Sequence, residues 1–171
     1  MRVLSLLEVF DFARIAHHGQ KRKYTGDDYI VHPISVARII EMNEGTLEMQ
    51  AAALLHDVVE DTVYTLADIN ALFGHDIATL VQWLTDTSTP EDGNRATRKT
   101  IDRKRLADAP VEAQLIKLAD MIDNSDSILE YDKSFAKVFI AEMKLLLDAM
   151  DKVVNTSLMK EARSIVKNAK T

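Results

Sequence analysis

One apolar segment of the sequence ends in a cluster of ionisable residues. The letters LEMQAAALL are followed directly by HDVVED at residues 56–61. On one continuous helix Glu60 would stand one turn beyond His56, and Asp61 one turn beyond Asp57. Imidazole nitrogens and carboxylate oxygens suit a divalent ion, and the outer acids suit water activation. Taken alone, the pattern is equally typical of a buried histidine beside a solvated, acidic helix end.

Two further ionisable residues interrupt apolar surroundings elsewhere in the chain. Asp120 lies within the run LIKLADMI, and His32 precedes Pro33 where proline suits the first turn of a helix. An isolated buried carboxylate is costly unless it is paired or bound to a metal. We therefore expect three helices to bring four ligands to one metal centre, namely His32, His56, Asp57 and Asp120. An octahedral ion would keep two positions for water or substrate.

The elements that must position these residues are helices. The five Gly and three Pro residues fall where the hydrophobic spacing breaks, and the intervals between them repeat at three and four residues. No strand-like alternation competes with this pattern, so the sequence predicts an all-α fold of about seven or eight helices. Among the expected helices are those over about 3–18, 47–59, 94–108, 134–149 and 151–168.

Composition and charge narrow the class of protein. A length of 171 residues suits a single domain over 1–171. The net charge of −6 disfavours binding to a nucleic-acid polymer or to an anionic membrane surface. The absence of Cys excludes disulfides and thiolate metal sites and favours an intracellular protein. Because no apolar run reaches about 20 residues and acids occur early, we expect a cytoplasmic location without a membrane span or signal peptide.

Four blocks of the sequence carry a family resemblance. They are AHHGQKRKYTGDDYIVHP at 16–33, AALLHDVVEDT at 52–62, LADINALFGHDIATLV at 66–81 and KLADMIDN at 117–124. In this order they resemble the HD-domain metal-dependent phosphohydrolases, and more narrowly the hydrolase domain of RelA/SpoT-type alarmone enzymes. The resemblance spans about residues 1–130, and the chain is similar to a stand-alone small alarmone hydrolase without a synthetase domain.

The resemblance assigns a reaction and a role to each matching residue. It implies hydrolysis of the 3′-pyrophosphate of (p)ppGpp, giving GDP or GTP and pyrophosphate. The four expected ligands match residues that bind Mn²⁺ in the family, and Glu60 and Asp61 match the pair that handles the attacking water. The positions that match contacts to the nucleotide are Arg22, Lys23, Asn124 and Ser127. We interpret the remaining histidines, His17, His18 and His75, as structural or surface groups.

Several positions depart from the family pattern and leave the substrate open. Asp28 stands where a Pro is common, and Met121, Asp123 and Asp126 replace common basic or aromatic residues. One alternative is therefore hydrolysis of another phosphorylated nucleotide, such as a nucleoside monophosphate or the 2′-phosphate of NADPH. A second alternative is a nucleotide-binding regulator without turnover.

Overall fold

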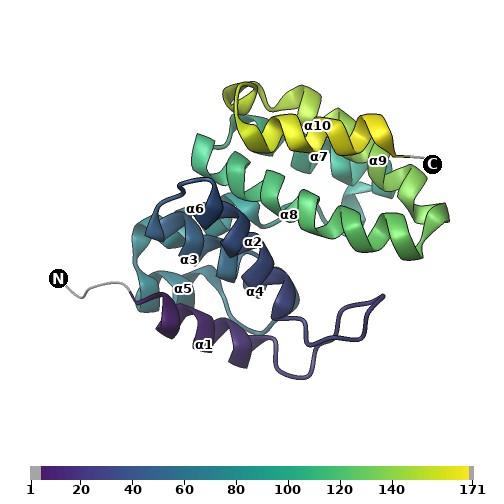
Figure 1. Cartoon of the computed structure of the whole chain (residues 1–171). Helices are drawn as coiled ribbons and strands as arrows, with labels where there is room; N and C mark the ends of the chain where they lie inside the picture. The colour runs from purple at the N-terminus through teal and green to yellow at the C-terminus, as the bar shows by residue number, and fades with distance from the viewer. Residues whose placement is uncertain (1–4, 170–171) are drawn as a thin grey trace. The chain divides into compact units, whose positions relative to one another are not determined.

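The computed structural model describes residues 5–169, in which helices are joined by loops, the longest between α1 and α2 (Figure 1). Over these residues it contains ten α-helices and two short 3₁₀ helices, and an isolated β-bridge joins Lys21 to Asp28. The all-α prediction is confirmed, although the helices exceed the seven or eight expected. The chain forms two compact units, residues 1–85 and residues 86–171. The assignment of one domain to the whole chain stays a prediction.

The first unit is built around one alanine-rich helix. Its helices are α1 (Leu6–Ala16), α2 (Val31–Met42), α3 (Leu47–Leu55), α4 (Val58–Asp61), α5 (Leu66–Phe73) and α6 (His75–Leu84). Helix α3 packs against α1, α2 and α6, and its residues 51–55 are all buried. Small side chains on several faces let three neighbouring helices approach it closely. Helix α3 is therefore the central helix of this unit.

The termini of these helices follow from local chemistry. The Thr65 side chain accepts a hydrogen bond from the Asp68 amide, and the Asp68 carboxylate accepts one from the Thr65 amide. This reciprocal capping begins α5 as the Thr-to-Asp spacing predicts. Gly74, with a φ of +92°, ends α5 and starts α6 in a conformation that a side chain would strain. The helix expected from residue 3 is found as α1, and residues 3 and 4 lie outside the described part.

The helix expected over 47–59 is interrupted at His56 and Asp57, two of the expected metal ligands. Helix α3 ends at Leu55, and α4 begins at Val58. The carbonyl of Ala53 lies 2.8 Å from the imidazole Nδ1 of His56, and Asp57 adopts φ −97° and ψ −6°. The side-chain bond competes with the backbone ladder at this point. His56 and Asp57 thus form the junction between two helices, and the placement of Glu60 one turn beyond His56 on a continuous helix is wrong.

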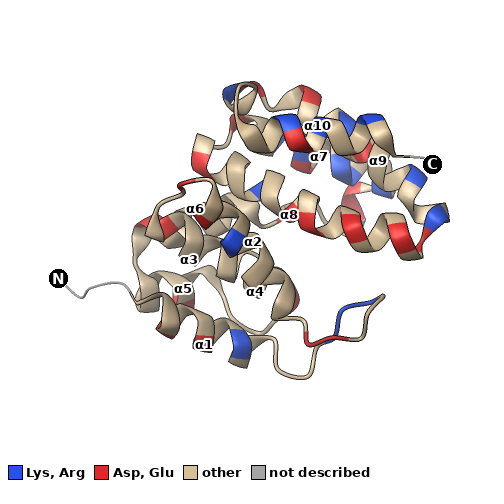
Figure 2. Cartoon of the chain, in the orientation of Figure 1, with Lys and Arg blue, Asp and Glu red and all other residues tan. Residues whose placement is uncertain are grey.

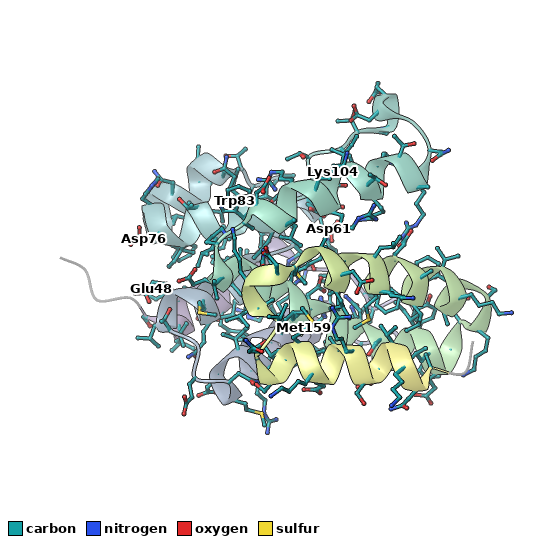
Figure 3. All side chains as sticks on the ribbon, turned by 90° about the horizontal axis from the view of Figure 1, so that it is seen from above. Glu48, Asp61, Asp76, Trp83, Lys104 and Met159 are labelled. Atoms are coloured by element: carbon teal, nitrogen blue, oxygen red, sulfur yellow. The ribbon has the colours of Figure 1, made fainter. Side chains whose placement is uncertain are left out.

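The second unit is a group of longer helices. They are α7 (Arg95–Asp108), α8 (Val111–Tyr131), α9 (Lys133–Ala149) and α10 (Ser157–Asn168), with 3₁₀ helices η1 at Pro90–Asp92 and η2 at Asp151–Val153. Helix α8 packs against α7, α9 and α10, and Met159 of α10 is fully buried (Figure 3). The last helix begins at Ser157, later than the expected 151, because the Thr156 side chain caps it by accepting from the Met159 amide. None of the helices within residues 5–169 combines the length and hydropathy that a membrane span requires.

Candidate metal centre

Two histidines and one aspartate of the first unit converge. His32 is the second residue of α2 and is 1% exposed, and His56 directly follows α3 and is 4% exposed. Their Nε2 atoms lie 3.6 and 3.0 Å from Oδ2 of Asp57. The ligand atoms of the three residues all lie within 4.8 Å of one another. The separations of 3.6 and 3.0 Å suit ligand atoms that share one divalent ion at about 2.0–2.2 Å.

The hydrogen bond of His56 fixes which of its nitrogens can bind a metal. A carbonyl oxygen can only accept, so the Nδ1 atom that faces Ala53 carries the ring proton. In the neutral ring, Nε2 then keeps its lone pair on the side of Asp57. Histidine ligands of metals commonly donate their other N–H in this way, which orients the ring. The donor set therefore fits a divalent metal ion.

Tyr29 joins the centre to the loop that precedes α2. Its hydroxyl donates a 2.6 Å hydrogen bond to Oδ2 of Asp57. Its ring centroid lies 5.9 Å from that of His32 and 4.8 Å from that of His17. The guanidinium carbon of Arg22 lies 6.0 Å from the same ring. One tyrosine thus orients a ligand oxygen and contacts a basic residue of the loop.

The two acids expected to handle water lie on α4. Asp61 ends the helix and Glu60 precedes it, and both residues are exposed to solvent over part of their surface. Loss of water around the Asp61 carboxyl and the negative charge of Asp57 raise the pKa of Asp61. Protonation of His17 or His56 and a hydrogen bond with Tyr29 would oppose this rise. A carboxyl with a raised pKa is better suited to accept a proton near neutral pH.

The loop between α1 and α2 carries basic and acidic stretches side by side (Figure 2). Lys21 and Asp28 form a 2.6 Å ion pair that closes the loop, and the Arg22 amide donates to the Asp27 carbonyl. The Lys23 ammonium lies 4.7 Å from the Tyr24 ring. Asp28, which departs from the family pattern, thus supplies a cross-loop contact that a Pro could not.

In the second unit, Asp120 lies on α8 and is 6% exposed. Its carboxylate accepts hydrogen bonds from the Lys117 ammonium at 2.7 Å and from the Asn124 amide at 2.6 Å. The Ser127 hydroxyl donates to the Asn124 carbonyl at 3.3 Å. These bonds account for a carboxylate in an apolar helix without any metal. The roles of Asp120 as a fourth ligand and of Asn124 and Ser127 as nucleotide contacts stay predictions.

A family model for the HD domain matches residues 10–159 of this chain. The chain belongs to the HD-domain family. An HD domain implies a divalent metal, and the cluster of His32, His56 and Asp57 supplies three atoms that could bind one.

Curated relatives of this HD domain share a name. MESH1 of Danio rerio, named a guanosine-3′,5′-bis(diphosphate) 3′-pyrophosphohydrolase, is 40% identical over 126 residues, which cover 70% of this chain and 66% of that protein. MESH1 of Homo sapiens is 40% identical over 122 residues with the same coverage. An enzyme of Vibrio cholerae with the same name is 36% identical over 126 residues, which make up 18% of its length. The HD domain thus spans just under two thirds of the MESH1 proteins.

Solved structures share the fold of this HD domain. A metazoan ortholog of SpoT, described as hydrolysing ppGpp, matches with a TM-score of 0.83 at 27% identity, over 98% of this chain and 97% of its own. A protein of Listeria monocytogenes EGD-e matches with a TM-score of 0.69 at 30% identity, over 85% of this chain and 97% of its own. Both likenesses agree with the all-α assignment.

Two residues of this HD domain that the sequence did not assign to the site lie beside it in the structure. His17, interpreted above as a structural or surface group, is buried beside Tyr29 and influences the charge of Asp61. Gln20 donates a hydrogen bond to the Asp61 carbonyl. Asp61 lies more than thirty positions beyond His17, Gln20 and Tyr29, so the local sequence pattern carries no signal of these contacts.

Proposed function

We propose that this HD domain is a Mn²⁺-dependent hydrolase that removes the 3′-pyrophosphate of (p)ppGpp. The observation that carries the proposal is the convergence of His32, His56 and Asp57 in an HD-family chain. Its MESH1 relatives are named for this reaction. We place the activity in the cytoplasm, in keeping with a sequence that holds no Cys.

The proposed metal ligands are His32, His56 and Asp57, with Asp120 as the fourth. Two imidazole nitrogens and two carboxylate oxygens suit a transition ion such as Mn²⁺. When bound, such an ion acidifies water and draws charge from phosphoryl oxygens. Tyr29 supports this assignment because its hydroxyl fixes the orientation of the Asp57 carboxylate.

Glu60 and Asp61 are the proposed acids that orient the attacking water and accept its proton. Both lie on α4, which begins directly after the ligand Asp57. The raised pKa of Asp61, caused by loss of water and by the charge of Asp57, makes its carboxylate a stronger base than an ordinary aspartate. The proton removed from water thus passes to a carboxylate of α4 as the water oxygen bonds to the phosphorus next to the ribose 3′-oxygen. The bond between that phosphorus and the 3′-oxygen breaks, pyrophosphate leaves, and the 3′-oxygen takes the proton from the α4 carboxyl to give the hydroxyl of GDP or GTP.

Arg22 and Lys23 are the proposed contacts of the first unit to the nucleotide. A guanidinium can stack on a purine, and an ammonium acts as a point charge for phosphate. The position of Arg22 near the Tyr29 ring supports this role, because Tyr29 also contacts a metal ligand. In the second unit, Asn124 and Ser127 are the proposed contacts. The partner is a small phosphorylated nucleotide.

A product assay on metal-depleted protein tests the proposal. After chelation and removal of EDTA, the protein is incubated with ppGpp with or without MnCl₂, and the products are separated by anion exchange. We expect the wild-type protein to form GDP and pyrophosphate in equal amounts only when MnCl₂ is present. The Asp57→Asn variant should form neither product. A parallel assay offers a nucleoside monophosphate or NADPH as substrate. Release of phosphate from either one, with ppGpp left intact, would favour the alternative phosphohydrolase activity. Binding of ppGpp without any product would identify a regulator.

A further inference from the structure

Two side chains near the end of α1 connect to the end of α4 through hydrogen bonds. His17 follows α1 and is 2% exposed. Its Nδ1 lies 2.7 Å from Oε1 of Gln20. The amide nitrogen of Gln20 in turn donates to the backbone carbonyl of Asp61 at 2.7 Å. The contacts therefore run from His17 through Gln20 to Asp61. Asp61 lies 41 residues beyond Gln20 in the sequence.

The chemistry of these bonds determines where the His17 proton lies. The carbonyl of Asp61 can only accept, so the NH₂ group of Gln20 must face it. The oxygen of the Gln20 amide then faces His17, and Nδ1 of His17 must donate to it. Only a donor at this position of residue 17 keeps the amide of Gln20 in the orientation that reaches Asp61.

The carbonyl of Asp61 has no partner within α4 because of where this helix ends. The last carbonyls of a helix have no partner within it, and α4 has four residues, too few to be stable alone. The carbonyl of Val58 is satisfied within the segment by the Thr62 amide and hydroxyl. The carbonyl of Asp61 is satisfied instead by Gln20, from outside the helix.

The His17 ring makes a second contact with the same site. It packs on the Tyr29 ring with centroids 4.8 Å apart, and the Tyr29 hydroxyl donates to the Asp57 carboxylate. His17 therefore contacts directly the tyrosine that orients a metal ligand, and reaches the end of α4 through Gln20. Its own Nε2 atom is buried and makes no hydrogen bond among the described residues, so Nδ1 is the atom through which it acts.

We propose that His17 and Gln20 are positioning residues that hold α4, and with it Glu60 and Asp61, in the geometry needed to activate water. The inference rests on the proposed function and adds two residues to it. Neither residue touches the reacting atoms in this account. Because a displacement of about 1 Å can cost about a hundredfold in rate, loss of the bridge lowers kcat while leaving metal binding intact.

Three variants and one control separate the bridge from simple packing. His17→Phe keeps a ring but has no donor, Gln20→Leu keeps the shape but not the amide, and His17→Asn keeps an N–H near the position of Nδ1. His18→Asn, at the exposed neighbour, is the matched control. The first readout is hydrogen exchange of the Asp61 and Thr62 amides in metal-free protein. The second compares kcat, KM and the Kd for Mn²⁺.

We expect His17→Phe and Gln20→Leu to speed exchange of these two amides by about tenfold, as for loss of one hydrogen bond. Turnover should fall by about ten- to a hundredfold, with KM and the Kd for Mn²⁺ within about twofold of wild type. His17→Asn should recover much of both losses, and His18→Asn should change neither. If His17→Phe does not fold, Gln20→Leu carries the same expectations at a half-buried site.

Equal losses in His17→Phe and His17→Asn would overturn the proposal, because packing alone would then explain them. Unchanged exchange at Asp61 and Thr62 in Gln20→Leu would overturn it as well. The exchange measurement needs neither metal nor nucleotide. It therefore tests the bridge even if the wild-type protein releases no pyrophosphate, an outcome that would count against the proposed function alone.

Discussion

Asp57 makes the contacts on which the candidate centre depends. Its Oδ2 atom lies 3.0 Å from Nε2 of His56 and accepts a hydrogen bond from Tyr29. The neighbouring α4 then carries Glu60 and Asp61, which we assign to water rather than to the metal. Asp57 is thus proposed to bind the ion, whereas Glu60 and Asp61 are proposed to act on the water.

Glu60→Gln and Asp61→Asn test this separation. Both remove a base while keeping the side-chain shape, so we expect turnover of ppGpp to fall by about a hundredfold or more in each. The Mn²⁺ content, measured by mass spectrometry of the purified protein, should stay at the wild-type level. Asp27→Asn, an exposed carboxylate on the preceding loop, is the control. Full activity in both variants would remove the assigned role.

The raised pKa of Asp61 makes a prediction about stability. Loss of water and the charge of Asp57 make the ionised carboxylate unfavourable in the folded protein. Its ionisation therefore lowers stability as the pH rises from 3.8, the ordinary pKa, through the raised pKa of the folded protein. In EDTA, Asp61→Asn should have a higher Tm than wild type at pH 7.

This difference in Tm should shrink as the pH falls toward 3.8, the ordinary pKa of the Asp61 side chain, because the wild-type carboxyl becomes protonated. Thermal unfolding followed by circular dichroism at several pH values measures it, with Asp27→Asn as the control. A wild-type protein that melts above Asp61→Asn at pH 7 would contradict the assigned environment.

At the scale of elements, short segments depend on side chains from elsewhere in their own unit. Before α7, the loop of residues 86–94 is held by Asp102, whose carboxylate accepts from the amides of Thr87 and Ser88 and from the Ser88 hydroxyl. Burial alone would raise the pKa of Asp102. The hydrogen bonds from Ser88 and Thr87 and the charge of Lys99 outweigh burial and lower this pKa.

Asp102→Asn tests this anchor. An amide cannot accept all three hydrogen bonds, so we expect a loss of about 2 kcal/mol in the free energy of unfolding at pH 7. Because the folded pKa is lowered, the ionised carboxylate stabilises the protein above pH 3.8, and this contribution disappears as the pH falls through the folded pKa. Urea unfolding measures the loss. Asp108→Asn, exposed on the same helix, should cost little, and an equal cost would refute the anchor.

The sequence predicts elements better than their breaks. Hydrophobic spacing and the Thr65 cap suffice for α5, because the forces that form it are local. The break between α3 and α4 depends on the His56 ring reaching the Ala53 carbonyl. The role of His17 depends on Asp61, a residue far along the chain. Periodicity contains no information on such side-chain contacts, so the sequence predicts the chemistry of the site but not its support.

At the scale of the whole molecule, the chain consists of two units with separate functional groups. The first brings together His32, His56 and Asp57, and the second holds Asp120 beside Lys117 and Asn124. The family model extends across both units, over residues 10–159. The proposed four-ligand centre would require one ion to bind Asp120 as well as His32, His56 and Asp57.

Diffraction from crystals grown with MnCl₂, with data collected at the manganese absorption edge, tests this requirement most directly. We predict one anomalous peak with Nε2 of His56, a nitrogen of His32 and carboxylate oxygens of Asp57 and Asp120 at about 2.0–2.3 Å, as is usual for such ligands. A peak bound elsewhere, or one that lacks the carboxylate of Asp120, would contradict the four-ligand centre.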